Sequence, residues 1–501
     1  MNQVQIGWSE VSLVPEGRKV SLSGQFYERI SDVVETPISV TALAISCGDA
    51  SAIFCSCDLV STSYRLLEAV RERLSKDKNF PIDSLIISAI HTHTSIGSTL
   101  NKDAPTASAS TLEILKKYLP DVTYESLAPY EGDDLLNDRD AFDFLADRIA
   151  RAAKEAWEAR EDGQYAAGFG RAAVGMCRRV CYDDGSAKMW GDTNSANFTE
   201  LEGGNDSGVE LLFTFTPDRK LTGVIANVAC PAQVLEHRSF ISSDYFGKLK
   251  GMLREEFGEE IFLLGICSPA GDQCPRDMIR WIEPETPIND PNIVRENLLA
   301  RRADPSMFDI RGCERVAKRL KNEIFSAYEE LTEQDFVAES VMIHKKIALD
   351  MPLRRVTPSE VEAARRTIEL FRKENGTKPI TFRDNARMHV YAGTLARSEL
   401  QEELDAIEIE MHVLRLGDLA FATNPYELFL NYGNQIRARS KATQTFLIQL
   451  SCGVYGYLPT EKAEQGSHYS AYVSSGYAGH EGGDLLVRKT LSEIAKMFPE
   501  Q

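Results

Sequence analysis

A series of short apolar runs, separated by stretches with helical periodicity, limits what this chain can fold into. The runs are rich in β-branched residues and end in Gly, Asp, Asn or Cys, as buried strands do. Examples are "ISVTALAISC" (38–47), "SLIISAI" (84–90) and "IFLLGIC" (261–267). Helical patterns lie between the runs, as at "DAFDFLADRIARAAKEAWEAR" (140–160) and "GGDLLVRKTLSEIAKMF" (482–498). The alternation predicts an α/β protein with layered mixed β-sheets flanked by helices.

The chain is long enough for a large core, with 501 residues. It has no internal repeat and no Gly/Ser-rich linker that would mark a boundary. Two stretches, 97–138 and 283–309, break the strand–helix rhythm and are expected to be insertions that cover a site. We therefore expect a single domain over 1–501 with two insertions.

Charge excludes several classes of partner. The chain has 75 acidic and 56 basic side chains, a formal net charge of −19, and no Lys/Arg cluster that could follow a phosphate backbone or an anionic membrane. No run approaches the roughly 20 apolar residues of a membrane-spanning helix, and no secretory signal is visible. Ten scattered cysteines do not form a disulfide framework. We expect a cytoplasmic protein that acts on a small molecule, with neither nucleic acid nor stable membrane association; the oligomeric state is open.

Two of the eight histidines, His91 and His93, stand one residue apart at the end of an apolar run. On a strand, residues i and i+2 share a face, so the two imidazoles would lie side by side. Such a pair suits Zn²⁺. It is also compatible with two hydrogen-bonded polar residues at a strand end. His389 and His412 lack partner spacing and are expected to be structural.

Several motifs, spread over most of the chain, occur in the same order as in a known family. They include "GWSEVSLVP", "SAIHTHTSIG", "MCRRVCYDDG", "NVACPAQVLEHRSFISSDYFG" and "SPAGDQCPRD", followed near the C-terminus by "NPYELF" and "YGYLPTEKAEQGSHYSA". The chain thereby resembles the neutral/alkaline ceramidases, which are zinc-dependent amidases acting on N-acyl sphingosines. The resemblance implies a ceramidase-like catalytic domain, hydrolase activity and about one zinc ion per chain.

The resemblance also implies roles for individual residues. His91, Glu427 and Tyr457 match metal ligands. His93, Tyr469 and Arg178 match residues that bind the substrate or stabilise the oxyanion when a metal-activated water attacks. Each residue type also has an ordinary structural role, in packing, helix capping or a surface ion pair.

One metal ligand of the family is missing, because Pro231 stands where the family has a histidine. Proline cannot bind zinc. His237, six residues further on, is the replacement that we favour, and Cys230 and Gln233 are alternatives. Other possibilities are that three ligands and extra water hold the ion, that a different metal binds, or that the metal has been lost.

Cys274 replaces a serine of the family in "SPAGDQCPRD". A thiol with a lowered pKa would be a nucleophile, whereas a thiol in an apolar environment is a small buried filler. The sequence thus leaves three hypotheses. They are a zinc-dependent hydrolase of an amide or ester, a Cys274-dependent acyl-transfer enzyme, and a binding protein without catalysis.

The expected substrate is soluble. The family's ceramidases carry an immunoglobulin-like domain after the catalytic one, and we expect none here. No apolar surface for extracting a lipid from a bilayer is evident. A soluble amide or ester, such as an N-acylated compound, is the predicted substrate class.

Overall fold

The computed structural model describes residues 1–101, 103, 111–123, 130, 132–280 and 309–498. The predicted insertion at 283–309 lies outside the described residues except for Asp309, and the insertion at 97–138 is described only in part. Within the described ranges, no helix is both long and apolar enough to cross a membrane. All ten cysteines are free thiols.

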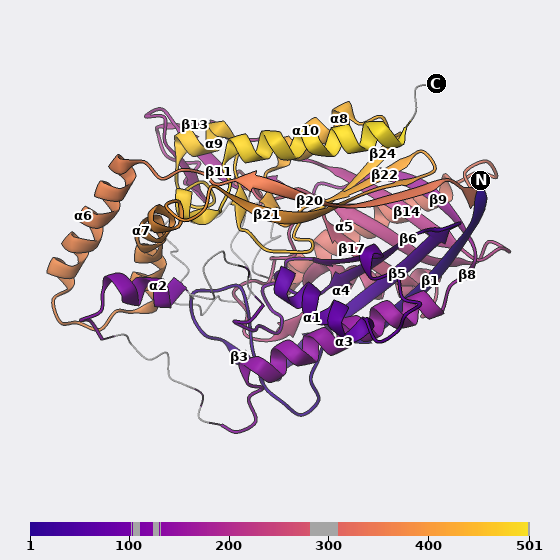
Figure 1. Ribbon diagram of the computed structural model, residues 1–501, viewed down its shortest axis with the longest axis horizontal. Helices are drawn as coiled ribbons and strands as arrows, with labels where there is room; N and C mark the ends of the chain where they lie inside the picture. The colour runs from indigo at the N-terminus through magenta and orange to yellow at the C-terminus, as the bar shows by residue number, and fades with distance from the viewer. Residues whose placement is uncertain (102, 104–110, 124–129, 131, 281–308, 499–501) are drawn as a thin grey trace.

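Three large sheets form the centre of the protein (Figure 1). The six-stranded sheet has the order β19 (Glu339–Ser340), β1 (Asn2–Ser12), β5 (Ser39–Cys47), β6 (Ala50–Cys57) and β7 (Leu85–Ala89), with β8 (Glu161–Asp162) pairing with β1. The second sheet has the order β17 (Phe262–Cys267), β15 (Leu221–Val228), β14 (Gly208–Phe215) and β9 (Gln164–Arg171). The third has the order β20 (Met342–Pro352), β21 (Ala406–Leu416), β22 (Leu419–Thr423) and β24 (Gln444–Ile448). Each sheet mixes parallel and antiparallel pairs.

Aromatic side chains join the sheets. Trp8 of β1 stacks on Phe262 of β17, with ring centroids 5.5 Å apart. Phe54 of β6 meets Phe421 of β22 at 5.4 Å. Because helix α3 (Asp138–Glu158) and strand β17 both pack on β5, every residue of β5 is buried. This explains why β5 appears in the sequence as an unbroken apolar run.

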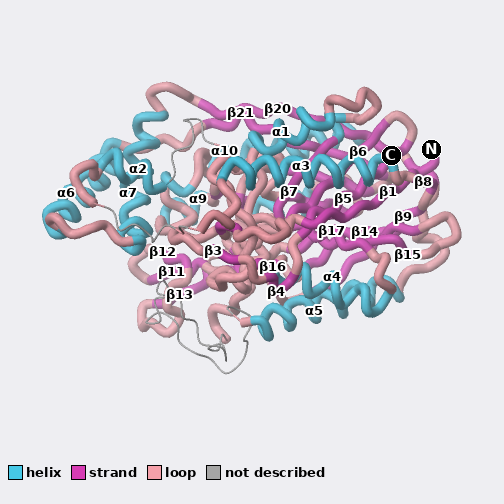
Figure 2. The backbone as a smooth tube through the Cα atoms, turned by 90° about the horizontal axis from the view of Figure 1, so that it is seen from below, coloured by secondary structure: helices cyan, strands magenta, loops and turns pink. Residues whose placement is uncertain are grey.

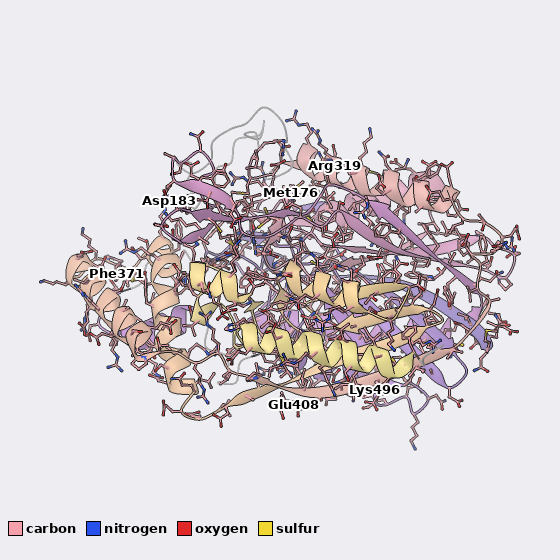
Figure 3. The ribbon with its side chains drawn as sticks, turned by 90° about the horizontal axis from the view of Figure 1, so that it is seen from above. Met176, Asp183, Arg319, Phe371, Glu408 and Lys496 are labelled. Carbon is pink, nitrogen blue, oxygen red and sulfur yellow. The ribbon has the colours of Figure 1, made fainter. Side chains whose placement is uncertain are left out.

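Helices cover the sheets on several sides (Figure 2). Those next to the large sheets are α1 (Tyr64–Leu74), α3 (Asp138–Glu158), α4 (Asp244–Phe257), α5 (Ile310–Glu329), α8 (Leu430–Arg439) and α10 (His480–Met497). Helix α3 packs on β1, β5 and β6, α5 packs on β9 and β14, and α10 packs on β20 and β21. Figure 3 shows Arg319 of α5 and Lys496 of α10 on opposite edges of the molecule.

The remaining helices are α2 (Thr111–Tyr118), α6 (Pro358–Asn375), α7 (Phe382–Leu400) and the short α9 (Glu461–Gly466), with 3₁₀ turns at Ile82–Ser84 and Val473–Ser475. Helices α2, α6 and α7 gather at one end of the molecule, which Phe371 marks in Figure 3. They share a small apolar cluster of their own. Helix α6 begins with a capping box, in which Thr357 and Glu360 satisfy each other's backbone N–H groups.

Short strand pairs connect the loops near the candidate site. They are β2 (Val20–Ser21) with β3 (Ile30–Ser31), β4 (Val34–Thr36) with β16 (Ile241–Ser242), β10 (Met176–Cys177) with β18 (Gln273–Cys274), and β23 (Glu427–Leu428) with β25 (Tyr457–Leu458). A three-stranded sheet has the order β12 (Ala187–Met189), β11 (Arg179–Tyr182) and β13 (Phe198–Leu201). The layered mixed α/β architecture predicted from the sequence is confirmed.

Candidate metal centre

His91 and His93 lie in the loop after β7, which ends at Ala89. The prediction that they extend a strand was therefore wrong. His91 has a left-handed backbone, with φ of 72°, a strained conformation for a non-glycine residue. Its backbone N–H donates to the carbonyl of Leu59, 3.0 Å away. The imidazoles still meet, because this kink brings their Nε2 atoms to 3.3 Å of each other.

The other ring nitrogen of His91 fixes how the side chain is used. Its Nδ1 lies 2.7 Å from the carbonyl oxygen of Val60, which can only accept a hydrogen bond. In the neutral imidazole Nδ1 therefore carries the hydrogen, and Nε2 has the free lone pair. Metal-binding histidines are oriented in this way by backbone carbonyls.

Glu427 and Tyr457 come from the short parallel pair of β23 and β25, in which they are directly opposite each other. The Glu427 Oε2 atom lies 3.5 Å from His91 Nε2. Burial, followed by the nearby Glu427 carboxylate, raises the pKa of the Tyr457 phenol well above its usual value. An imidazole, a carboxylate and a phenol thus converge from segments that are far apart in the sequence.

Arg178 and Tyr469 border the same group. Arg178 is 3 % exposed, and its Nη2 donates to the Tyr457 hydroxyl at 3.3 Å and to the Gly271 carbonyl at 2.9 Å. The Tyr469 ring meets that of Tyr457 edge-on, with centroids 5.6 Å apart. Burial, followed by Glu427, raises the pKa of Tyr469, so the phenol keeps its proton. A cation and a phenol thus lie beside the predicted ligand Tyr457.

Glu236 is the residue that the sequence analysis missed. Its Oε2 lies 3.7 Å from His93 Nδ1 and accepts a 2.9 Å hydrogen bond from Gln233 Nε2. Its Oε1 lies 3.1 Å from His237 Nε2. Burial raises the pKa of this carboxyl, but His237, His93 and Gln233 outweigh that effect and hold it at about 2. The carboxylate is therefore ionised beside His93.

The segment that contains Pro231 also contributes side chains near Arg178 and Glu236. Gln233 Oε1 accepts a 3.3 Å hydrogen bond from Arg178 Nη1, so Gln233 links Arg178 to Glu236. The Cys230 thiol instead contacts the Val174 carbonyl at 3.4 Å, and burial raises its pKa well above the usual value. The structure thus places His237 against Glu236, and the role of His237 as a ligand stays a prediction.

Cys274 is fully buried on β18, which pairs with β10 beside Arg178. Its thiol lies 3.4 Å from the Arg276 carbonyl oxygen. Burial raises the pKa of Cys274 to about 11, although Arg178 acts in the opposite direction. The thiolate needed for nucleophilic attack is thus disfavoured at neutral pH.

The chemistry of the donors fits a divalent metal ion. Imidazole, carboxylate and phenolate are all zinc or transition-metal ligands, and the side chains of His91 and Glu427 are 9 % and 15 % exposed. His93 Nδ1 is buried and makes no hydrogen bond within the described part of the chain, and the carboxylate of Glu236 lies 3.7 Å from it.

A second group of ligand-type side chains lies elsewhere. The ligand atoms of Glu410, His412 and Cys452 all lie within 4.8 Å of one another. Among the described residues, no other three His, Cys, Asp or Glu side chains meet this distance. The sequence analysis gave this group no role as a site. In this group the Glu410 carboxylate is already paired with Arg71 and His412.

Comparison with solved structures shows the same fold. The whole chain superimposes on 76 % of the neutral ceramidase from Pseudomonas aeruginosa, with a TM-score of 0.65 and 13 % sequence identity. A ceramidase in complex with C2 is similar over the same shares, with a TM-score of 0.63 and 12 % identity. No family model and no curated protein matches the sequence. The chain therefore has a ceramidase-like fold.

Proposed function

We propose that the protein is a metal-dependent hydrolase that cleaves an amide or ester bond in a small-molecule substrate. The observation that carries this proposal is the convergence of His91 Nε2 and Glu427 Oε2 at 3.5 Å, with Tyr457 opposite Glu427 across β23 and β25. The ceramidase-like fold supports the same reaction class.

His91, Glu427 and Tyr457 would hold the ion, and zinc suits this donor set. When bound, the ion would polarise a substrate carbonyl and lower the pKa of water, from about 15.7 towards roughly 7. Another residue could complete the ligand set, since His93 Nε2 lies 3.3 Å from His91 Nε2.

The chain's own donors would act on the developing oxyanion. Arg178 is held by Gly271 and Gln233, so its guanidinium is oriented before substrate binds. The Tyr469 hydroxyl, protonated because of its raised pKa, is the second donor. Preorganised donors of this kind each contribute roughly 3 to 4 kcal/mol to transition-state stabilisation.

The acyl-transfer alternative needs an activated Cys274. The raised pKa and complete burial of this thiol favour a structural role instead. Free cysteines suit a reducing compartment, in line with the proposed cytoplasmic location and a soluble substrate.

A substrate panel tests the proposal. Protein loaded with one equivalent of zinc is assayed against N-acyl amines, N-acyl amino acids, N-acyl sugars and aryl esters, before and after treatment with a chelator. We expect hydrolysis of at least one class, lost on chelation and restored by zinc. Arg178→Met should lower kcat with little change in zinc content.

His480→Ala is the matched control, because His480 lies on α10 and pairs with Glu464 away from the site. This variant should hydrolyse at the rate of the wild type. Turnover that survives complete metal removal, or a wild type that takes up no metal, would contradict the proposed function.

A further inference from the structure

His93 and Glu236 form a pair beside His91 that the expected role of His93, stabilising the oxyanion, does not explain. His93 Nδ1 faces Glu236 Oε2 at 3.7 Å, and His93 Nε2 faces His91 Nε2 at 3.3 Å. The position of the imidazole is therefore set on both sides by polar groups.

The hydrogen positions decide what His93 can do. If Nε2 carried the hydrogen, it would donate to His91, and the lone pair of Nδ1 would face the Glu236 carboxylate with no donor between them. If Nδ1 carries the hydrogen, it points at the carboxylate, and both Nε2 lone pairs face each other. The second arrangement places the Nδ1 hydrogen opposite the Glu236 carboxylate, 3.7 Å away, and leaves two facing lone pairs that a cation between the rings would bind.

The distances fit a shared metal ion. Two nitrogens bound to one tetrahedral zinc ion at about 2.0 to 2.1 Å lie about 3.3 Å apart. The two Nε2 atoms are 3.3 Å apart, and Glu427 Oε2 is 3.5 Å from His91 Nε2. His91 is thus at ligand spacing from both His93 and Glu427.

The surroundings hold His93 in this place. A Cβ atom on Gly24 would lie 2.5 Å from His93 Cγ, so only glycine fits behind the ring, and Gly24 has a φ of 96°. Arg29, 4 % exposed, donates to the backbone carbonyls of His93 at 2.6 Å and Glu236 at 2.8 Å. One guanidinium therefore fixes both members of the pair.

We propose that His93 is a metal ligand through Nε2, oriented by the Glu236 carboxylate, and that it takes the coordination position lost at Pro231. This inference rests on the proposed metal dependence. It differs from the expectation that His237 is the replacement, because the Nε2 atom of His237 is already 3.1 Å from Glu236.

Glu427 must turn towards His93 for the ion to be enclosed. The ligand atoms of His91, His93 and Glu427 are not all within 4.8 Å of one another, unlike those of the described group around His412. The Glu427 side chain is 15 % exposed and has rotatable bonds for this movement. We expect metal binding to move Glu427 more than either histidine.

X-ray absorption spectroscopy on the zinc-loaded full chain tests the ligand. Wild type should show scattering from two imidazoles, His93→Ala from one, and His237→Ala from two. In competition with a chromogenic chelator, His93→Ala should weaken zinc binding by at least about 100-fold, and the isosteric Glu236→Gln by about 10- to 100-fold. His480→Ala should bind as tightly as wild type.

The outcomes separate this inference from the proposed function. A wild type that takes up no zinc overturns both. Zinc-dependent hydrolysis in a wild type with a single imidazole on the metal, or a count that drops only in His237→Ala, overturns the role of His93 alone. If His93→Ala does not fold, the imidazole counts of wild type and His237→Ala still decide the question: two in both supports His93, and a drop to one in His237→Ala overturns it.

Discussion

The protein contains two pairs of histidines in ring contact, and they differ in how their nitrogens are bonded. Ring centroids are 4.8 Å apart for His91 and His93 and 5.0 Å apart for His344 and His412. Burial, as the largest cause, lowers the pKa of His93 to about 3 and of His344 to about 4. Residue type, contact distance and burial therefore do not distinguish the pairs.

In the pair of His344 and His412, every ring nitrogen already has a hydrogen-bonding partner. His344 contacts the Ser51 carbonyl at 2.8 Å and His412 Nδ1 at 2.8 Å, and His412 Nε2 contacts Glu410 Oε1 at 2.8 Å. Arg71 pairs with both oxygens of Glu410, at 2.7 and 2.9 Å. The Glu410 carboxylate therefore already has a cationic partner, and the structural role expected for His412 is in agreement with these contacts.

The comparison teaches that nearness of ligand-type side chains does not make a metal site. Glu410, His412 and Cys452 are the closer group, yet both ring nitrogens of His412 and both oxygens of Glu410 already have partners. Around His91 the atoms are further apart, but Nε2 of both histidines faces the site. Uncommitted lone pairs decide which group can take an ion.

The largest expected difference is in zinc affinity. His91→Ala should weaken zinc binding by about 1,000-fold, because a structural zinc gains roughly 10 to 16 kcal/mol from about four ligands. His412→Ala should leave the zinc content unchanged. Metal analysis after dialysis against a chelator series measures both. Loss of zinc from His412→Ala and retention by His91→Ala would reverse the comparison.

Stability should change in the opposite order. His412 is fully buried and lies between His344 and Glu410, so His412→Ala leaves a cavity, removes the partner of His344 Nε2 and takes one contact from Glu410, which keeps Arg71. We expect it to destabilise the metal-free protein by about 3 kcal/mol. His93→Ala should cost less than about 1.5 kcal/mol, because Nδ1 makes no hydrogen bond there. Urea denaturation gives both values, and equal losses would remove the distinction.

The thiols near the two pairs should be equally inert. Burial, as the largest cause, raises the pKa of Cys452 to about 12 and of Cys274 to about 11. At pH 7.5 we expect iodoacetamide to modify half-buried Cys181 first and the other two about 100-fold more slowly. Peptide mass spectrometry over time measures the rates. Rapid alkylation of Cys274, with loss of activity, would instead support the acyl-transfer hypothesis.

The smallest effect is expected at His480, a more exposed histidine paired with a glutamate. His480 Nδ1 lies 2.9 Å from Glu464 Oε2. Burial lowers the pKa of His480, but the hydrogen bond and the charge of Glu464 outweigh burial and raise this pKa above its usual value. A raised folded-state pKa contributes stability that is fully present below about pH 6.5 and is lost as pH rises through the folded value. His480→Gln should remove less than about 1 kcal/mol at pH 5.5 and nothing at pH 8.5. Urea titrations at both pH values check this, and a larger loss at pH 8.5 would contradict it.

The sequence predicted the parts of the fold that have strong periodicity. The apolar runs became β5, β7 and β17, and two helical patterns became α3 and α10. Strand β20 was not anticipated, because its side chains are largely exposed or half-buried and form no apolar run. Helix α7 was also missed.

Prediction of the site depended on motifs and stopped where tertiary contacts begin. Motif resemblance named His91, Glu427 and Tyr457, and the structure brings them together. Nothing in the local sequence showed that Glu236 would face His93, because that contact depends on two loops meeting in space. The spacing of Gln233 and Glu236 in one turn indicated only that these two side chains could contact each other.

The pairing of β23 with β25 also determines when the centre can exist. Glu427 and Tyr457 meet only through these two-residue strands, which lie in the last fifth of the chain. During synthesis, a nascent chain that has not yet exposed residue 457 has the two histidines but neither the carboxylate nor the phenol in position. A metal ion held by all three ligands could therefore be bound only after residue 457 has been translated and β25 has paired with β23.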